Sequence, residues 1–358
     1  MEHSGFLNGN IKIERVASWL FVIGIIVLCL IYFSNFLQPL VLGVMAWYLI
    51  YVFKEYMRRV RIRKKQLPEW LLTILAFVFI FLVTYGIVEM VSHNLELILS
   101  RAPTYIENSR PMLESIKTIE GFEAVKQRLI DKVGDFDLRP IVTGLLNGIS
   151  SFAGNILLII IYVGFLLAEQ KFFRRKLKIV LQDSKQGPEY IVILREVNNA
   201  VQKYVLVKTQ ISLLTGVLSY FILLAFRVDF PILWAFLIFL FNYIPYVGSL
   251  IATLLPALFA VFQFQSFIIF VWVFLAIEVV QIMVGNVLEP KVMGRTLNLS
   301  PLGVLLALAF WGIIWGILGM IISVPITSIL VIIASRIPNL RFVAVWLSET
   351  GDLYKSEV

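Results

Sequence analysis

Apolar residues along the chain gather into eight long stretches, separated by shorter polar or charged segments. A helix needs roughly 20 mainly apolar residues to cross a hydrocarbon core about 30 Å thick. Most of the stretches reach or approach that length, so the pattern predicts an all-α, polytopic membrane protein. The stretches cover residues 16–33, 38–53, 69–91, 142–168, 206–226, 231–262, 267–285 and 301–335.

The sixth and eighth stretches are too long for one crossing and too short for two. At 1.5 Å per residue, their 32 and 35 residues would form straight helices of roughly 48 and 52 Å. Both also contain residues that weaken or break a helix. These are Asn242, Pro245, Gly248 and Pro256 in the sixth stretch, and Gly312, Gly316, Gly319 and Pro325 in the eighth.

Two half-helices that enter and leave the membrane on the same side would account for both the length and the breakers. Irregular backbone is tolerated at membrane depth where protein or a water-filled cavity surrounds it. We therefore expect about six full transmembrane helices plus two broken or re-entrant helical hairpins, with amphipathic helices outside the membrane. Two kinked and tilted spans are the alternative. Paired segments interrupted by Gly and Pro also point to the binding site of a transporter.

The charges between the stretches predict the orientation of the chain. Residues 54–65 carry seven Lys or Arg, and residues 170–208 carry nine against three acidic residues. Segment 92–139 has seven basic and eight acidic residues and so lacks a basic excess. Because basic loops stay in the cytoplasm, we expect both termini to be cytoplasmic and segment 92–139 to face outward.

The same features divide the chain into successive parts. Apolar positions three and four residues apart follow residues 98–119 and 194–205, which predicts helices outside the membrane. A Gly187-Pro188 pair indicates where the inner helix begins. The expected parts are N-terminal transmembrane helices (1–91), an extracytoplasmic helical segment (92–139), a transmembrane helix (140–169), cytoplasmic amphipathic helices (170–205), a transport core with both hairpins (206–338) and a cytoplasmic tail (339–358).

Composition agrees with a membrane protein and offers little catalytic chemistry. Hydrophobic residues make up 59% of the chain, charged residues 15%, and the mean hydropathy is +0.89. Cys29 is the single cysteine, and His3 and His93 have no metal-ligand spacing. No phosphate-binding loop, dinucleotide fingerprint or nucleophile elbow is present. We therefore expect no enzyme, no cofactor and no metal. The net charge of +8 is better explained by basic cytoplasmic loops than by a nucleic-acid partner.

Two segments of the C-terminal half carry a resemblance to a known family. They are FNYIPYVGSLIATLLPALFA (241–260) and NVLEPKVMGRTLNLSPLGVLLALAFWGIIWGILGMIISVP (286–325). The chain resembles the autoinducer-2 exporter family of bacterial permeases, and the order of its elements fits across nearly the whole length. The resemblance implies transport of a small solute, and the signalling molecule autoinducer-2 is the family's best-known substrate. It also implies a homo-oligomer, a pentamer, and some relatives are sodium–proton antiporters.

Glu278 is the first candidate for transport chemistry, because it is a carboxylate near the middle of the seventh stretch. An ionisable side chain at that depth costs on the order of a few kcal/mol and marks a functional site by default. Gln281 and Gly285 follow three and seven residues later, on roughly the same helix face. A neutral, hydrogen-bonded structural glutamate is the alternative.

We expect Glu278, Gln281 and Asn242 to line one site at mid-membrane, where the tip of the first hairpin meets the seventh stretch. Glu289 is predicted to pair with Lys291 or Arg295, either as an interfacial ion pair or within a gate. Close helix packing explains glycines such as Gly316 and Gly319. The candidate solute- or ion-binding residues are Asn242, Pro245, Gly248, Glu278, Gln281 and Asn286, and the candidate gate or hinge residues are Glu289, Pro290, Gly312, Gly316, Gly319 and Pro325.

These observations favour a secondary transporter of the bacterial inner membrane that exports a small polar molecule, such as autoinducer-2, by alternating access. One alternative is a sodium (or lithium)/proton antiporter that uses the intramembrane glutamate. A second alternative is a membrane scaffold that transports nothing. The expected partners are a small polar solute or cation, the lipid bilayer and further copies of the chain.

Overall fold

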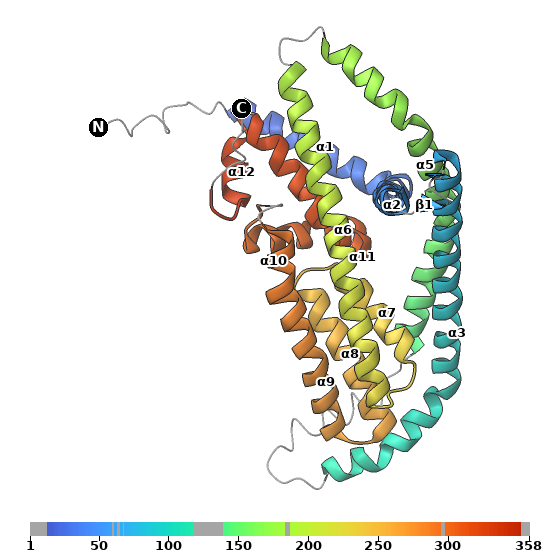
Figure 1. Cartoon of the computed structure of the whole chain (residues 1–358). Coiled ribbons are helices and arrows are strands. Elements are labelled where there is room, and N and C mark those ends of the chain that lie inside the picture. The colour runs from blue at the N-terminus through green and yellow to red at the C-terminus, as the bar shows by residue number, and fades with distance from the viewer. Residues whose placement is uncertain are drawn as a thin grey trace.

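The computed structural model describes residues 13–58, 61–62, 65–66, 68–117, 139–182, 187–294 and 298–351, and nearly all of them are helical (Figure 1). The elements are α1 (Ile13–Tyr32), α2 (Ser34–Arg58), β1 (Arg61–Ile62), β2 (Lys65–Gln66), α3 (Glu69–Lys117), α5 (Arg139–Gln182), α6 (Gly187–Ala225), α7 (Pro231–Phe241), α8 (Val247–Phe264), α9 (Phe267–Gln281), the π-helix η1 (Ile282–Leu288), α10 (Glu289–Met293), α11 (Pro301–Arg336) and α12 (Arg341–Leu347). β1 and β2 form one short antiparallel pair within the basic loop.

Six of the described helices are long and apolar enough to cross a membrane, which confirms a polytopic helical membrane protein. Their segments are Ser34–Lys54, Glu69–Arg101, Gly187–Ala225, Val247–Phe264, Phe267–Met293 and Pro301–Arg336. The bent helix α5 brings the number to seven if its two parts are counted as one span. This set differs from the expected one, because it includes the hairpin helices α8 and α11. The first apolar stretch supplies only a shorter apolar helix, Leu20–Tyr32.

Two helices run far beyond their apolar stretches. α3 continues for 49 residues, from Glu69 to Lys117, so the stripe after residue 98 extends the third stretch without a break. α6 begins at Gly187, where the Gly-Pro pair predicted a start, and joins the inner amphipathic segment to the fifth stretch. Residues 118–138 of the expected extracytoplasmic segment lie outside the described residues. In Figure 1, α3, α6 and α9 run lengthwise, whereas α2 is seen end-on and crosses them.

The sixth stretch forms a helical hairpin, as its length and breakers predicted. α7 and α8 pack against each other on either side of a turn at residues 242–246. At the open end, the Gln263 side chain bridges the chain that enters the hairpin. Its Oε1 accepts from the Asp229 N–H (2.8 Å) and its Nε2 donates to the Arg227 carbonyl (2.9 Å). The first hairpin therefore begins and ends at the same side of the molecule.

The eighth stretch is also folded back on itself, at Gly316. This residue has φ 62° and ψ −141° within an otherwise helical segment. Trp311 Nε1 donates to Thr327 Oγ1 at 3.1 Å, although residues 16 apart would lie about 24 Å apart along a straight helix. A Cβ on Gly319 would also collide with the Trp311 carbonyl oxygen. Gly316 is thus the turn of the second hairpin, and the sequence-based explanation by helix packing was wrong for it.

The two hairpins open at opposite ends of the long helices. α9, η1 and α10 cover 27 residues from Phe267, next to the base of the first hairpin, to Met293. The second hairpin begins shortly afterwards, at Pro301, at the far end of this run (Figure 1). There the C-terminal segment closes its base, since the Ser300 N–H donates to the Leu347 carbonyl at 2.8 Å.

Candidate functional site

A stripe of polar residues runs through the buried face of α6. It is made of Lys208, Ser212, Thr215 and Ser219, which we call the α6 polar stripe, and each is at most 3% exposed. Spacings of four, three and four residues keep them on one face of the helix. α6 packs among several helices, which include α7, α9, α10 and α11. α6 therefore buries a line of polar side chains beside apolar ones such as Val205, Val207 and Ile211.

At one end of the stripe lies a buried ion pair. Lys208 Nζ is 2.6 Å from Glu289 Oε1, and the two side chains are 4% and 21% exposed. A buried ammonium without a partner carries a desolvation cost of several kcal/mol, which pairing offsets. The structure thus corrects two expectations. Glu289 pairs with Lys208, whereas the sequence predicted Lys291 or Arg295 as its partner, and Arg295 lies outside the described residues. Lys208 is a buried charge rather than a loop cation.

The tip of the first hairpin is tied to the same face of α6. Asn242 Nδ2 donates to Ser212 Oγ at 3.1 Å, and both residues are buried. One residue on, the hydroxyls of Tyr243 and Thr209 lie 2.7 Å apart. Pro231 starts α7, and Asn242 ends it as its C-cap residue. The breaker that was expected to offer its amide to a solute therefore holds the hairpin against α6.

The turn itself is strained and open. Tyr246 has φ 61° and ψ −62°, and the Val247 N–H donates to the Pro245 carbonyl at 2.7 Å. This is the positive-φ γ-turn, the rarer and more strained of the two forms. Tyr246 is 56% exposed, whereas Gly248 is buried so tightly that a Cβ would collide with the Phe241 carbonyl oxygen. Strained backbone of this kind is concentrated at ligand clamps and switch regions.

Next to α6, α9 changes into a π-helix. η1 spans residues 282–288, and Val284 packs with Val207 and Ile211 of α6. Gln281, the last residue before η1, is buried, and its Nε2 has no hydrogen-bond partner among the described residues. Buried polar atoms are normally paired, and π-helical turns are frequent at functional sites. This combination marks a second polar position beside α6.

The remaining candidate residues differ in how far they are buried within the protein. Glu278 is half-buried on α9, Asn286 and Pro290 are exposed, and Pro245 is half-buried. Asn242 contacts α6 at Ser212, and η1, which follows Gln281, packs on the adjacent residue Ile211. The described contacts do not join Glu278 to Asn242. Within the described ranges, no three His, Cys, Asp or Glu side chains gather to hold a metal ion.

The other candidate hinge residues belong to the second hairpin. Gly312 faces the Met320 side chain of the returning arm, and Gly319 faces the Trp311 backbone. Pro325 is buried in the second arm. Trp315 Nε1 donates to the Leu30 carbonyl of α1 at 2.9 Å, so the turn of this hairpin contacts the N-terminal helices. These residues close the hairpin on itself.

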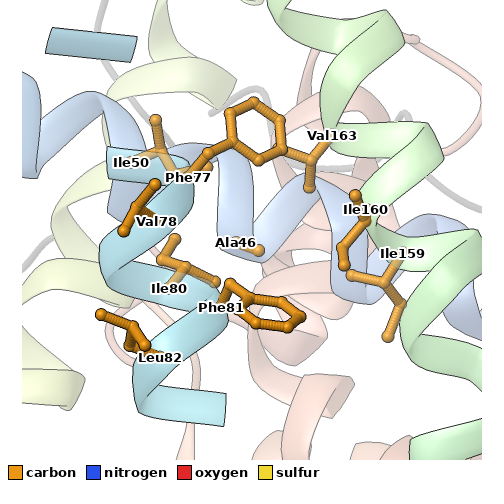
Figure 2. Close-up of a pocket in the computed structure, with 10 residues that line it drawn as sticks. All are labelled: Ala46, Ile50, Phe77, Val78, Ile80, Phe81, Leu82, Ile159, Ile160 and Val163. Carbon is orange, nitrogen blue, oxygen red and sulfur yellow. The ribbon is translucent and has the colours of Figure 1, made fainter. Parts of the chain in front are cut away.

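An apolar cavity of about 250 Å³ lies apart from the polar residues, between α2, α3 and α5. Its lining side chains are all apolar and include Ile50, Phe77, Phe81 and Val163 (Figure 2). The side chains that surround it supply no hydrogen-bonding group. It is therefore unsuited to hold a polar solute.

Several residues of the polar face were not found from the sequence as parts of a site. Thr209, Ser212, Tyr204 and Tyr243 were not singled out, and Lys208 was counted among the loop charges. Tyr204 is buried, and its hydroxyl has no partner among the described residues. The available signal was the spacing of Lys208, Ser212, Thr215 and Ser219, which places all four on one face of a helix.

The fold and this site define a multi-pass helical membrane protein with two oppositely directed hairpins and with buried polar side chains where the first hairpin meets α6. The family model described as AI-2E family transporter matches residues 19–339, so the chain belongs to the AI-2E family of transporters.

Three relatives extend over most of the chain. A protein of Borreliella burgdorferi named "Putative transport protein" is 30% identical over 95% of this chain and 93% of its own length. A Haemophilus influenzae protein of the same name is 30% identical over 81% of this chain and 84% of its own length. The "AI-2 transport protein TqsA" of Escherichia coli is 28% identical over 91% of this chain and 93% of its own length.

Proposed function

We propose that this protein is a secondary transporter that exports a small polar solute by alternating access. The buried polar contact between the first hairpin and α6, made by Asn242 and Ser212, is the observation that carries the proposal. A purely structural bundle of apolar helices has no need to bury Lys208, Ser212, Asn242 and Gln281 together. The solute would bind where the tip of the first hairpin meets the α6 polar stripe.

Alternating access is supported by the opposed directions of the two hairpins. Transporters commonly place their site where broken helices from opposite sides meet, and open it to one side at a time. The strained γ-turn at Tyr246 gives the first hairpin an exposed tip whose conformation can change. The Lys208–Glu289 pair would close one end of the route, with Glu289 and Pro290 acting as the gate.

The solute class follows from the groups available. Hydroxyl, amide, ammonium and carboxylate groups suit a small polyhydroxylated or otherwise polar molecule. An autoinducer-2-like signal belongs to this class, and one relative is named for AI-2 transport. We extend that substrate to this chain as part of the proposal.

Transport by reconstituted protein is the direct test. Purified protein in proteoliposomes is assayed with a panel of labelled solutes that includes autoinducer-2. We expect Ser212→Ala and Asn242→Ala to weaken solute affinity at least several-fold, because each removes one partner of a buried hydrogen bond.

Ser323→Ala is the matched control, since Ser323 is buried outside the α6 polar stripe and its hydroxyl donates to the Met320 carbonyl of its own helix. Unchanged affinity in both Ser212→Ala and Asn242→Ala would exclude this site. A protein that moves no solute of the panel and no cation would instead be a scaffold.

A sodium (or lithium)/proton antiporter is the second candidate, and the half-buried Glu278 favours it. The carboxylate sits within the apolar helix α9, where an ionisable group is costly unless it is used. Glu278→Gln keeps the shape and removes the titratable proton. An antiporter would lose sodium-driven proton movement in vesicles without solute, whereas a solute exporter that does not use this proton would be unaffected.

We further propose a bacterial inner-membrane location with both termini in the cytoplasm, and assembly as a homo-oligomer, a pentamer. In a Cys29-free background, a cysteine at Glu120 should react with an impermeant thiol reagent added to intact cells, and one at Arg61 should not. A cysteine at Thr296 should also be protected if the first hairpin is re-entrant. Reversed labelling would contradict the orientation, and the mass of the purified complex tests the subunit number.

A further inference from the structure

The C-terminal part of α5 is a short basic helix that continues a candidate span. We call residues 171–182, KFFRRKLKIVLQ, the α5 extension. It carries five cationic residues and no acidic one. α5 bends by 55° between its apolar part, Gly154–Gln170, and the part from Arg175 to Leu181 (Figure 1). The extension therefore leaves the line of the span soon after the apolar residues end.

Large apolar side chains of the α5 extension are exposed. Each of the following is more than half exposed: Phe172, Phe173, Ile179 and Val180. None of the four belongs to a hydrophobic cluster of the described core. Exposed apolar residues within a span are explained by lipid tails, but this segment is too rich in charge to cross the membrane.

Charged and apolar positions of the extension are separated around the helix. At 100° per residue, positions 171, 174, 175 and 178 fall within one arc of about 100°. The exposed apolar residues share the opposite side with one cation, Lys176. The charge of Lys176 is matched by Glu169, whose Oε1 lies 2.6 Å from Lys176 Nζ. The apolar face thus carries no unmatched charge, and the basic face is unbroken.

The extension lies at the same end of the molecule as the other basic segment. Ala76 and Phe77, near the start of α3, pack with Val163 and Leu167, near the end of the apolar part of α5. Gln170, at the end of the apolar part of α5, and Glu69, at the start of α3, therefore lie at the same height along the two packed helices. The basic loop that precedes α3, with seven Lys or Arg in residues 54–65, joins the helices at this level.

We propose that the α5 extension is an interfacial helix that binds the anionic phospholipid headgroups of the leaflet at this end of the protein. Its apolar face would enter the boundary between headgroups and acyl chains, and its basic arc would contact the phosphates. Helices of this kind combine a strongly basic face with Phe and Leu on the other. Juxtamembrane Lys and Arg are attracted to anionic leaflets, each by roughly a fivefold gain in binding at low salt.

A lipid surface fits these features better than a soluble acidic partner. The segment continues directly from a span, so its distance from the headgroups is fixed by the fold. A nucleic acid would use the basic arc but would leave the four apolar side chains in water. An anionic lipid surface accommodates both faces of the helix at once.

Full-length protein in lipid nanodiscs provides the test. In a Cys29→Ser background, Val180→Cys is labelled with a fluorophore, and quenching by aqueous acrylamide is measured. Discs are made of phosphatidylcholine alone or with about one third phosphatidylglycerol. We expect at least threefold less quenching in the anionic discs at low salt, and a loss of that difference at high salt, because salt screens exposed charges.

Charge removal provides the decisive variant. The difference in quenching between the two lipids should disappear when four charges are removed together, by Lys171→Gln, Arg174→Gln, Arg175→Gln and Lys178→Gln. It should persist when the charge is kept, in Lys171→Arg combined with Lys178→Arg. Equal quenching in both lipids, or protection that persists without the four charges, would overturn the proposal. Size-exclusion profiles confirm that each variant is folded, and the readout does not depend on transport.

Discussion

Both hairpins of this protein contain glycine and proline residues that interrupt their helices, but different hydrogen bonds hold the two hairpins in place. The first turns over five residues, and its tip is bonded to α6 through Asn242 and Tyr243. The second turns at Gly316 alone, and Trp311 joins its two arms to each other through Thr327. The first hairpin thus depends on the polar stripe of its neighbour, whereas the second has a bond between its own arms and contacts α1 through Trp315.

This difference separates a binding element from a supporting one. A hairpin whose tip contacts buried polar groups can change its affinity for a polar solute when it moves. A hairpin closed by glycine and tryptophan contacts moves as one body or not at all, because close-packed arms resist small displacements. We therefore expect changes at the first tip to affect transport, and changes at the second turn to affect stability.

The largest effect should come from the Lys208–Glu289 ion pair at the end of the α6 polar stripe. Glu289→Leu leaves Lys208 as an unmatched buried charge, which should cost about 3 kcal/mol of stability and abolish transport. Lys208→Met combined with Glu289→Leu should restore most of the stability, because no charge remains buried, but not transport. Thermal unfolding in detergent measures the first quantity. A double variant as unstable as the single one would show that the pair is not coupled.

A smaller effect is expected at the glycines of both turns. Gly248→Ala and Gly319→Ala each force a Cβ against a backbone carbonyl oxygen, which should cost about 2 kcal/mol. Gly316→Ala meets no atom but must adopt a backbone conformation close to one reserved for glycine, at about 1–3 kcal/mol. Gly86→Ala in α3 is the control, since a Cβ there has no neighbour within 4 Å. Equal melting temperatures for all four variants would show that neither turn requires glycine at these positions.

The contrast between the hairpins is sharpest in single hydrogen-bond deletions. Asn242→Ala and Trp311→Phe each remove one buried hydrogen bond and should lose about 1 kcal/mol of stability. Only Asn242→Ala should also raise the solute concentration needed for half-maximal transport. If Trp311→Phe raises that concentration equally, the second hairpin also takes part in solute binding, and the two hairpins do not have separate roles.

The last effect is confined to alkaline pH and concerns the base of the first hairpin, where α3 contacts it. Tyr105 donates to Asp229 Oδ2 at 2.6 Å, and Arg101 lies 3.8 Å from the same oxygen. Burial, then the bond to Asp229, raise the pKa of Tyr105 to about 12. Since the folded state holds this proton more tightly, its stabilisation is complete below pH 10 and is lost between pH 10 and about 12.

The loss should not exceed about 1.4 kcal/mol per pH unit. Tyr105→Phe should remove this part of the pH dependence, as measured by unfolding in detergent from pH 9 to 12. Tyr32→Phe is the control, because Tyr32 is largely exposed on α1. An unchanged slope in Tyr105→Phe would mean that the contact does not form.

The sequence by itself determined the class of the protein and the positions of its helices. Apolar stretches are set by composition along the chain, and breakers such as Pro245 and Gly316 act within a few residues of themselves. Both features are local, so the eight stretches and the two hairpins could be predicted without any knowledge of packing. The family motifs lie in the same segments and gave the transporter assignment that the comparison supports.

Only the tertiary structure decided which polar groups meet. Lys208 and Glu289 are 81 residues apart, and Ser212 and Asn242 are 30 apart, so no spacing rule connects them. In the sequence, Lys208 looks like one more cation of a basic loop, because α6 runs unbroken from the polar segment into the apolar one. Its burial depends on how α7, α9, α10 and α11 surround α6, and the free energy of that packing is a property of all five helices together.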